Sequence, residues 1–125
     1  MRDKELALNI IATIEEVLHT ILNRTVSITS VDDFLKSETG MILLDSVCIK
    51  LMAVGESIKN LDKVTEKRLL STYQHINWRD IMGMRDIIVH HYFDIDADVI
   101  FKTLQDDIPQ LLTALHELRK TLLSR

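Results

Sequence analysis

The sequence predicts an all-α fold, with residues 1–125 forming a single domain built as an up-and-down bundle of four to five helices. Apolar residues recur at spacings of three and four residues through long stretches of the chain, as they do on the buried face of a helix. The composition agrees, because 46% of the residues are hydrophobic and the chain has only three Gly and one Pro, fewer than a turn-rich β fold would use. A chain of this length forms one core rather than two.

Two long helices are expected in the first half of the chain, from Asp3 to Asn23 and from Glu38 or Met41 to Asn60. The first has a predicted buried stripe of Leu6, Ile10, Ile14, Val17 and Ile21. The stripe of the second is Leu44, Val47, Leu51, Val54, Ile58 and Leu61. A second apolar line widens the second stripe, so this helix is expected to lie deep in the bundle or to face another subunit.

The polar segment between these helices, residues 24–37, is expected to be a loop with one short helical turn. Ser30 stands three residues before Asp33, as in a helix-capping signal, and Phe34 is available to pack into the core.

Two neighbouring residues late in the second helix bear on function. Glycine inside a helix costs about 1 kcal/mol relative to alanine, so we expect another helix to approach closely at Gly55. Two interpretations of Glu56 remain open: an exposed salt-bridge partner, or a carboxylate directed towards the motif at residues 85–92.

Three further helices are expected in the second half. A short one covers Asp62 to Tyr73, with Asp62 or Thr65 as its cap and with Leu69 and Leu70 packed inward. The next begins near Trp78 and is capped by Asn77.

This fourth predicted helix should weaken near His91 or Tyr92. Asp96 is expected to cap the last helix, which begins at Ala97 and runs to about Leu123 with an apolar set that includes Val99. Pro109 lacks a backbone N–H, so a kink is expected near residues 105–107.

Candidate catalytic residues lie on the fourth predicted helix. Asp86 and His90 are four residues apart, so the carboxylate is expected to reach the imidazole and to hold its orientation. Arg85 precedes His90 by five residues, an angular offset of roughly 140° on a helix. One copy of the helix therefore does not bring Arg85 and His90 onto one small ligand, unless the helix frays or a second chain completes the site.

Arginine with histidine suits the cleavage of RNA by its own 2′-hydroxyl group. The imidazole can move the proton, and the guanidinium can stabilise the charge that develops on the phosphate. The sequence has no glycine-rich phosphate loop, His-Glu-x-x-His, Cys-x-x-Cys or nucleophile elbow. The adjacent His90 and His91 diverge by about 100° and make a poor chelating pair, so neither a metal site nor a cofactor is expected.

The net charge and the cysteine content limit the kinds of binding surface and of covalent cross-link that are expected. The net charge of −4 argues against a general nucleic-acid-coating surface. Residues 59–85 carry +3 against −7 for the remainder, and most of their lysines are expected on solvated helix faces, with Arg85 the exception. Cys48 is the single cysteine, so it cannot form an intramolecular disulfide, and it is expected to be a small buried hydrophobe.

The N-terminal stretch lacks the pattern of a signal peptide, and Glu15 and Glu16 would interrupt a membrane span. A cytoplasmic location, with no membrane association, is therefore expected.

Residues 85–92 of the central motif, RDIIVHHY, have the pattern Arg, four residues, His, any residue, Tyr, with a polar residue directly after the Arg. This pattern resembles that of HepT-type HEPN toxins. The flanking segments 78–81, WRDI, and 92–96, YFDID, are similar to that family, as is 54–57, VGES. The resemblance covers nearly the whole chain, and it is strongest from Asp45 to Pro109 and weak before Gly40.

This resemblance implies a HEPN-like bundle that dimerises through the motif helix and acts as a metal-independent endoribonuclease toxin on RNA, with tRNA as a candidate substrate. Arg85 would bind the scissile phosphate, His90 would transfer the proton, and Asp86 would orient His90, with Glu56 as a supporting residue. The partner implied is a minimal nucleotidyltransferase antitoxin that transfers AMP to Tyr92. The alternative is a non-catalytic helical module that binds a nucleotide or a partner helix in the same groove.

Overall fold

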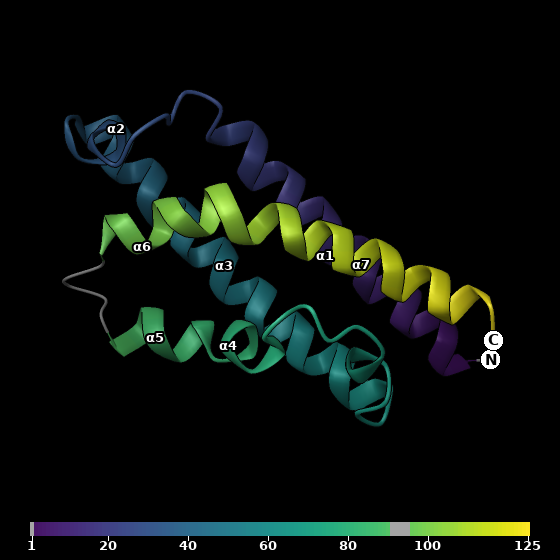
Figure 1. The fold of residues 1–125 in the computed structure, drawn as a ribbon. Helices are drawn as coiled ribbons and strands as arrows, with labels where there is room; N and C mark the ends of the chain where they lie inside the picture. The colour runs from purple at the N-terminus through teal and green to yellow at the C-terminus, as the bar shows by residue number, and fades with distance from the viewer. Residues whose placement is uncertain (1, 91–95) are drawn as a thin grey trace.

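A computed structural model describes residues 2–90 and 96–125, and every regular element within these residues is helical. In chain order these are α1 (Arg2–Arg24), α2 (Asp32–Leu35), α3 (Glu38–Val64), the 3-10 turn η1 (Leu70–Thr72), α4 (Trp78–Met82), α5 (Met84–His90), α6 (Ala97–Lys102), the π-helical segment η2 (Thr103–Asp107) and α7 (Ile108–Leu123). Figure 1 shows α1 and α7 side by side, with both chain termini at one end and with α4 and α5 lying along α3. The predicted all-α bundle is confirmed.

The core forms where α1, α3 and α7 meet. Its fully buried members include Leu18 of α1, Ile58 of α3 and Leu118 of α7, and each such side chain contributes roughly 1.5–3 kcal/mol by leaving water. In the parts of the chain that the structure describes, no helix combines the length and apolar character needed to cross a membrane.

The buried stripe of α1 differs from the prediction. The buried positions are Ala7, Ile11, Ile14, Leu18 and Ile21. Leu6, which was predicted to be buried, is 44% exposed, and Ile10 and Val17 are only partly buried. Adjacent apolar pairs such as 10–11 and 17–18 offer two stripes one residue apart. Packing of α1 against both α3 and α7 selects the second stripe.

The predicted helix from Asp62 to Tyr73 is wrong. α3 continues to Val64 and ends in a Schellman motif, in which Lys67 N–H donates to the Asp62 carbonyl (2.8 Å) and Glu66 N–H to the Lys63 carbonyl (3.1 Å). Glu66 takes a left-handed φ of 57° and Lys67 one of 61°, which ordinarily favours glycine.

The predicted inward packing of Leu69 and Leu70 is confirmed, because both residues are buried beside the short turn η1. Thr65, predicted as an N-cap, instead closes the end of α3, where its hydroxyl donates to the Leu61 carbonyl (2.7 Å).

The loop before α3 has the predicted helical turn, α2, with Phe34 fully buried. The Asp33 carboxylate accepts hydrogen bonds from the Ser30 N–H (3.2 Å) and the Thr29 N–H (2.8 Å). The salt bridge to Lys36 (2.8 Å), followed by hydrogen bonds from the N–H and the hydroxyl of Thr29, holds the Asp33 pKa well below its usual range.

The last predicted helix is interrupted by the π-helical segment η2. Pro109 lies in the first turn of α7 and cannot donate a backbone hydrogen bond, so the wider helical turn falls where the kink was predicted. Asp96 caps α6 as expected, because its carboxylate accepts from the Asp98 N–H (2.9 Å). Val99, predicted as a core residue, is 53% exposed.

Candidate active site

The predicted motif helix consists of two short helices separated by Gly83. Asn77 caps α4 as predicted, because its side chain accepts from the Asp80 N–H (3.2 Å). Gly83 takes φ −83° and ψ −4°, and the Gly83 carbonyl accepts from the Ile87 N–H (3.2 Å) in the next turn. The candidate catalytic residues therefore lie on the separate seven-residue helix α5.

The motif segment packs against α3 at Gly55, as predicted. A Cβ atom at Gly55 would lie 2.8 Å from the Ile81 carbonyl oxygen and 3.7 Å from the Met84 Cβ, so only glycine admits this approach without displacement. Ile88, one turn after Met84, is 5% exposed and anchors α5 in the core. This packing places Arg85 opposite Glu56, the residue that follows the glycine.

Arg85 is held loosely between two carboxylates. Its Nε lies 3.7 Å from Glu56 Oε1, and its Nη1 lies 3.5 Å from Asp86 Oδ1. The Arg85 side chain is 48% exposed and that of Glu56 is 50% exposed, so each contact contributes between nothing and about 1 kcal/mol. The guanidinium is therefore free to exchange these contacts for a phosphate. Both interpretations of Glu56 hold, since it is exposed and also faces the motif.

His90 is oriented by Asp86, but through a different group from the one predicted. The Nδ1 atom of His90 lies 2.6 Å from the backbone carbonyl oxygen of Asp86, whereas the Asp86 carboxylate contacts Arg85. The predicted contact between carboxylate and imidazole is thus replaced. The short aspartate side chain pairs with its neighbour, while the ring folds back against the helix backbone.

This hydrogen bond determines the tautomer of His90. A carbonyl oxygen can only accept, so Nδ1 must carry the hydrogen. The neutral ring then presents Nε2 as a proton acceptor, and the protonated ring presents it as a donor. Because His90 is exposed, Nε2 can serve as an acid or a base towards a ligand at the surface.

Arg85 and His90 are both exposed on α5 but make separate contacts, which agrees with the predicted angular offset. α5 ends at His90 within the described part of the chain. His91 and Tyr92, where the helix was predicted to weaken and where the regulatory tyrosine was placed, lie outside the described residues.

Cys48 is confirmed as a buried hydrophobe. It is 2% exposed, and burial, with a smaller contribution from Asp45, raises the pKa of its thiol to about 11. A thiol with so high a pKa is a poor nucleophile. Over residues 2–90 and 96–125, no three His, Cys, Asp or Glu side chains are arranged to hold a metal ion.

Lys59 lies beside the candidate site but was not among the residues predicted from the sequence. Its Nζ lies 3.8 Å from Glu56 Oε1, the oxygen that also faces Arg85. The spacing of three residues between Glu56 and Lys59 was the available signal. The position of Arg85 on another helix could not be read from that spacing.

The fold and the site define a small helical-bundle protein that presents an arginine and an oriented histidine on one surface helix. The chain matches the family described as "Ribonuclease HepT-like" over residues 10–118, and it belongs to that family.

Relatives support this membership. The chain is 40% identical over 70 residues to "Probable ribonuclease HepT" of Thermococcus cleftensis, which covers 56% of this chain and 60% of the relative. It is 32% identical over 82 residues to a "Putative RNase" of Caldanaerobacter subterraneus, which covers 66% and 67%. A "Gamma-glutamylcyclotransferase and putative RNase" of Methanocaldococcus jannaschii is 35% identical over 80 residues, 64% of this chain but only 33% of the relative. No solved structure matches the chain significantly.

Proposed function

We propose that this protein is a metal-independent endoribonuclease toxin of a type II toxin–antitoxin pair, in which Arg85 and His90 carry the chemistry. The observation that supports this most is the state of the two side chains on α5. The Arg85 guanidinium is half-exposed and only loosely paired, and His90 is fixed as the Nδ1–H tautomer with Nε2 left for a ligand.

The reaction follows from these groups. The imidazole Nε2 takes the proton from the 2′-hydroxyl, whose oxygen forms a bond to the adjacent phosphorus. The bond from phosphorus to the 5′-oxygen breaks, and an imidazolium returns a proton to that oxygen. The products are a 2′,3′-cyclic phosphate and a 5′-hydroxyl, while Arg85 stabilises the charge on the phosphoryl oxygens. Asp86 is a positioning residue, since its carbonyl holds the His90 ring.

A homodimer would overcome the angular offset between Arg85 and His90. On α3, Ile42 (61% exposed) and Ile49 (68% exposed) stand seven residues apart, and Glu56 follows after another seven. Positions seven apart share a helix face, so two exposed isoleucines lie on the same face of α3 as Glu56, the residue beside Arg85. A second copy packed on this face would bring two α5 helices together around one cleft.

Complementation tests the shared cleft. Arg85→Ala and His90→Ala proteins should each be inactive, and their mixed dimer should recover part of the activity because one cleft regains one arginine and one histidine. Ile49→Glu should yield a monomer by light scattering with little cleavage. Full activity in a stable monomer would contradict the dimer.

We propose Tyr92 as the target of the antitoxin, a minimal nucleotidyltransferase. The tyrosyl oxygen would attack the α-phosphorus of ATP and release pyrophosphate. The AMP adduct would place bulk and negative charge two residues from His90, where RNA must bind. With purified partner and ATP, the wild type should gain the mass of one AMP group and Tyr92→Phe should not. Equal modification of both proteins would exclude Tyr92.

Cleavage itself is tested with total cellular RNA, tRNA included, in EDTA. Wild-type protein whose intact mass shows no adduct should cleave, and His90→Ala should not, although both should unfold at the same temperature. If the unmodified wild type binds RNA or nucleotides without cleaving, the non-catalytic helical module is the better description.

A further inference from the structure

We propose that three lysines beside the site, Lys59, Lys63 and Lys67, form a track that binds the sugar–phosphate backbone of the RNA strand next to the cleaved bond. This inference rests on the proposed function and adds to it how the substrate strand is held.

The three lysines border one hollow on the surface. The hollow has a volume of about 510 Å³ and is lined by Lys59, Asp62, Lys63, Glu66, Lys67 and Met82. Its walls come from the C-terminal half of α3, from the turn that follows α3 and from α4, so this open hollow lies beside the helix pair that holds the motif.

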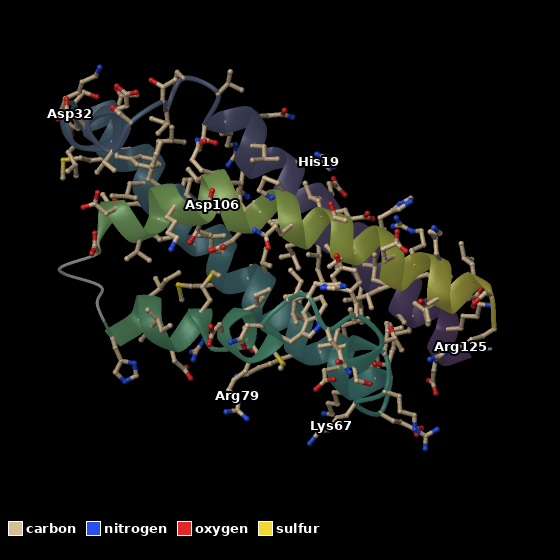
Figure 2. All side chains as sticks on the ribbon, viewed as in Figure 1. His19, Asp32, Lys67, Arg79, Asp106 and Arg125 are labelled. Carbon is tan, nitrogen blue, oxygen red and sulfur yellow. The ribbon has the colours of Figure 1, made fainter. Side chains whose placement is uncertain are left out.

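The spacing of the lysines suits a chain of phosphates. Lys59 and Lys63 are one turn apart on the same side of α3, which separates their Cα atoms by about 6 Å along the helix. Lys67 lies beyond the helix end, and the Schellman turn with its left-handed residues returns it to the same hollow. Figure 2 shows Lys67 and Arg79 projecting on the side of the molecule away from α7.

One carboxylate, that of Glu56, lies between the lysine track and the candidate active site. Glu56 Oε1 lies 3.7 Å from Arg85 Nε and 3.8 Å from Lys59 Nζ. Lys59 is therefore the cation next to Arg85, and the order of positive groups across the surface is Arg85, Lys59, Lys63, Lys67. A phosphate at Arg85 would have its neighbours along the strand at the lysines.

The local charge favours a polyanion over an acidic protein. Asp62 and Glu66 lie in the hollow and Glu56 lies beside Lys59. Arg68, outside the hollow, pairs with Glu66 (Nη2 to Oε2, 3.6 Å), so four cations face three carboxylates and Arg85 adds a further positive charge at the end of the track. Ammonium groups bind phosphates as point charges and read no sequence. Met82 is half-buried in the hollow and offers an apolar surface to a sugar or base edge.

The experiment measures binding without cleavage. A 2′-O-methyl RNA of about twelve nucleotides cannot supply the attacking hydroxyl, so its affinity reports binding alone. The logarithm of affinity should fall with the logarithm of salt concentration by about 0.7 for each phosphate contact to a single strand. The triple variant Lys59→Ala, Lys63→Ala, Lys67→Ala should therefore bind more weakly, with a slope reduced by about 2.

A matched control removes the same charge elsewhere. Lys50 lies on the opposite side of α3 from Lys59, Lys102 lies on α6 and Lys120 lies on α7. The triple variant Lys50→Ala, Lys102→Ala, Lys120→Ala should keep the wild-type slope. The single substitution Lys63→Glu provides a second test with minimal risk to folding, and it should weaken binding at low salt more than Lys102→Glu does.

The outcomes separate this inference from the proposed function. If the wild type cleaves ordinary RNA but the track variant keeps the wild-type slope, the track is wrong and the ribonuclease stands. Equal loss of slope in both triple variants would also overturn the track, because the effect would then be general charge. If the wild type neither cleaves RNA nor binds the methylated strand, the proposed function fails and the track fails with it.

Discussion

Among the residues that the structure describes, two arginine–glutamate pairs join helices, and they differ in geometry and in exposure to solvent. Arg119 of α7 donates to the Glu15 carboxylate of α1 through both terminal guanidinium nitrogens, Nη1 and Nη2, and the two side chains are 29% and 20% exposed. Arg85 of α5 faces Glu56 of α3 through a single contact of 3.7 Å, with both side chains about half-exposed. The Arg119–Glu15 pair is bidentate and partly buried, whereas the Arg85–Glu56 pair has one long contact and is half-exposed to solvent.

The difference distinguishes an arginine whose contacts hold two helices together from one whose contacts leave it accessible to a ligand. The bidentate hydrogen bonds to Glu15 raise the pKa of Arg119 further above its already high value, and they use the fork that a phosphate would need. The contacts of Arg85 are longer, because its Nε lies 3.7 Å from Glu56 and its Nη1 lies 3.5 Å from Asp86, and they are exposed to solvent. A surface pair of this kind stabilises the fold little, so its arginine can be given to a ligand at little cost in stability.

The largest expected effect is on catalysis at Arg85. Removing one donor that stabilises a transition-state charge lowers kcat by about 10²–10³. Arg85→Ala should therefore reduce the initial rate of RNA cleavage by that factor, and Arg85→Lys should recover only part of it because lysine lacks the planar fork. Arg119→Ala, assayed well below its unfolding temperature, is the matched control and should stay close to the wild-type rate. An equal loss in both variants would remove the distinction between the pairs.

Gly55→Ala should disturb the Arg85 pair by moving the helix that carries it. The new Cβ would meet the Ile81 carbonyl at 2.8 Å. Overpacking costs about 1–3 kcal/mol, offset by about 1 kcal/mol of gained helix propensity. Denaturant titration should show a net loss of stability, together with reduced cleavage by the folded protein. At Gly83 an added Cβ would lie 3.3 Å from the Arg79 carbonyl oxygen and 3.8 Å from that of Asp80, so Gly83→Ala should lose less stability than Gly55→Ala. The reverse order would contradict the packing argument.

Arg119→Met should destabilise the fold by about 1 kcal/mol, because it leaves Glu15 unpaired in a partly buried position, and a hydrogen bond to a charged group is worth about 1.5–3 kcal/mol before allowance for exposure. For a domain of this size that lowers Tm by roughly 4 °C. Arg85→Met, the matched substitution, should change Tm by less than about 2 °C. Calorimetry on both variants tests this, and equal shifts would mean that the Arg85 pair is structural too.

The smallest expected effect is on the reactivity of the Cys48 thiol. Cys48 lies on the core side of α3, and Glu56 lies on the outer face of the same helix. Burial raises the Cys48 pKa to about 11, so roughly one thiol in a thousand is ionised at pH 8, and the thiolate is the reactive form. Iodoacetamide should leave the native protein unmodified and add one group in denaturant. Rapid native labelling would show that α3 opens on its core side.

Local features of the fold could be predicted from the sequence because neighbours in the chain determine them. Asn77 and Asp96 cap their helices as expected, and Pro109 is accompanied by an altered helical turn. Gly55 marked a close helix approach because a helix-interior glycine needs such a reason.

The buried face of α1 and the end of α3 depend on tertiary packing and could not be predicted. The stripe of α1 is selected by two partner helices at once, and the end of α3 uses left-handed backbone at Glu66 and Lys67 without any glycine. Within the candidate site, the sequence indicated Arg85, Asp86 and His90. It could not show that the Asp86 carboxylate would pair with Arg85 and leave His90 to a carbonyl.

The most direct test of the central claim, that Arg85 and His90 promote attack by the 2′-hydroxyl of RNA, is an analysis of the ends that cleavage leaves. In EDTA, the unmodified protein should give 2′,3′-cyclic phosphate and 5′-hydroxyl ends, and the 2′-O-methylated strand should stay intact. Products with 5′-phosphate ends, cleavage of the methylated strand, or undiminished cleavage by His90→Ala would contradict it.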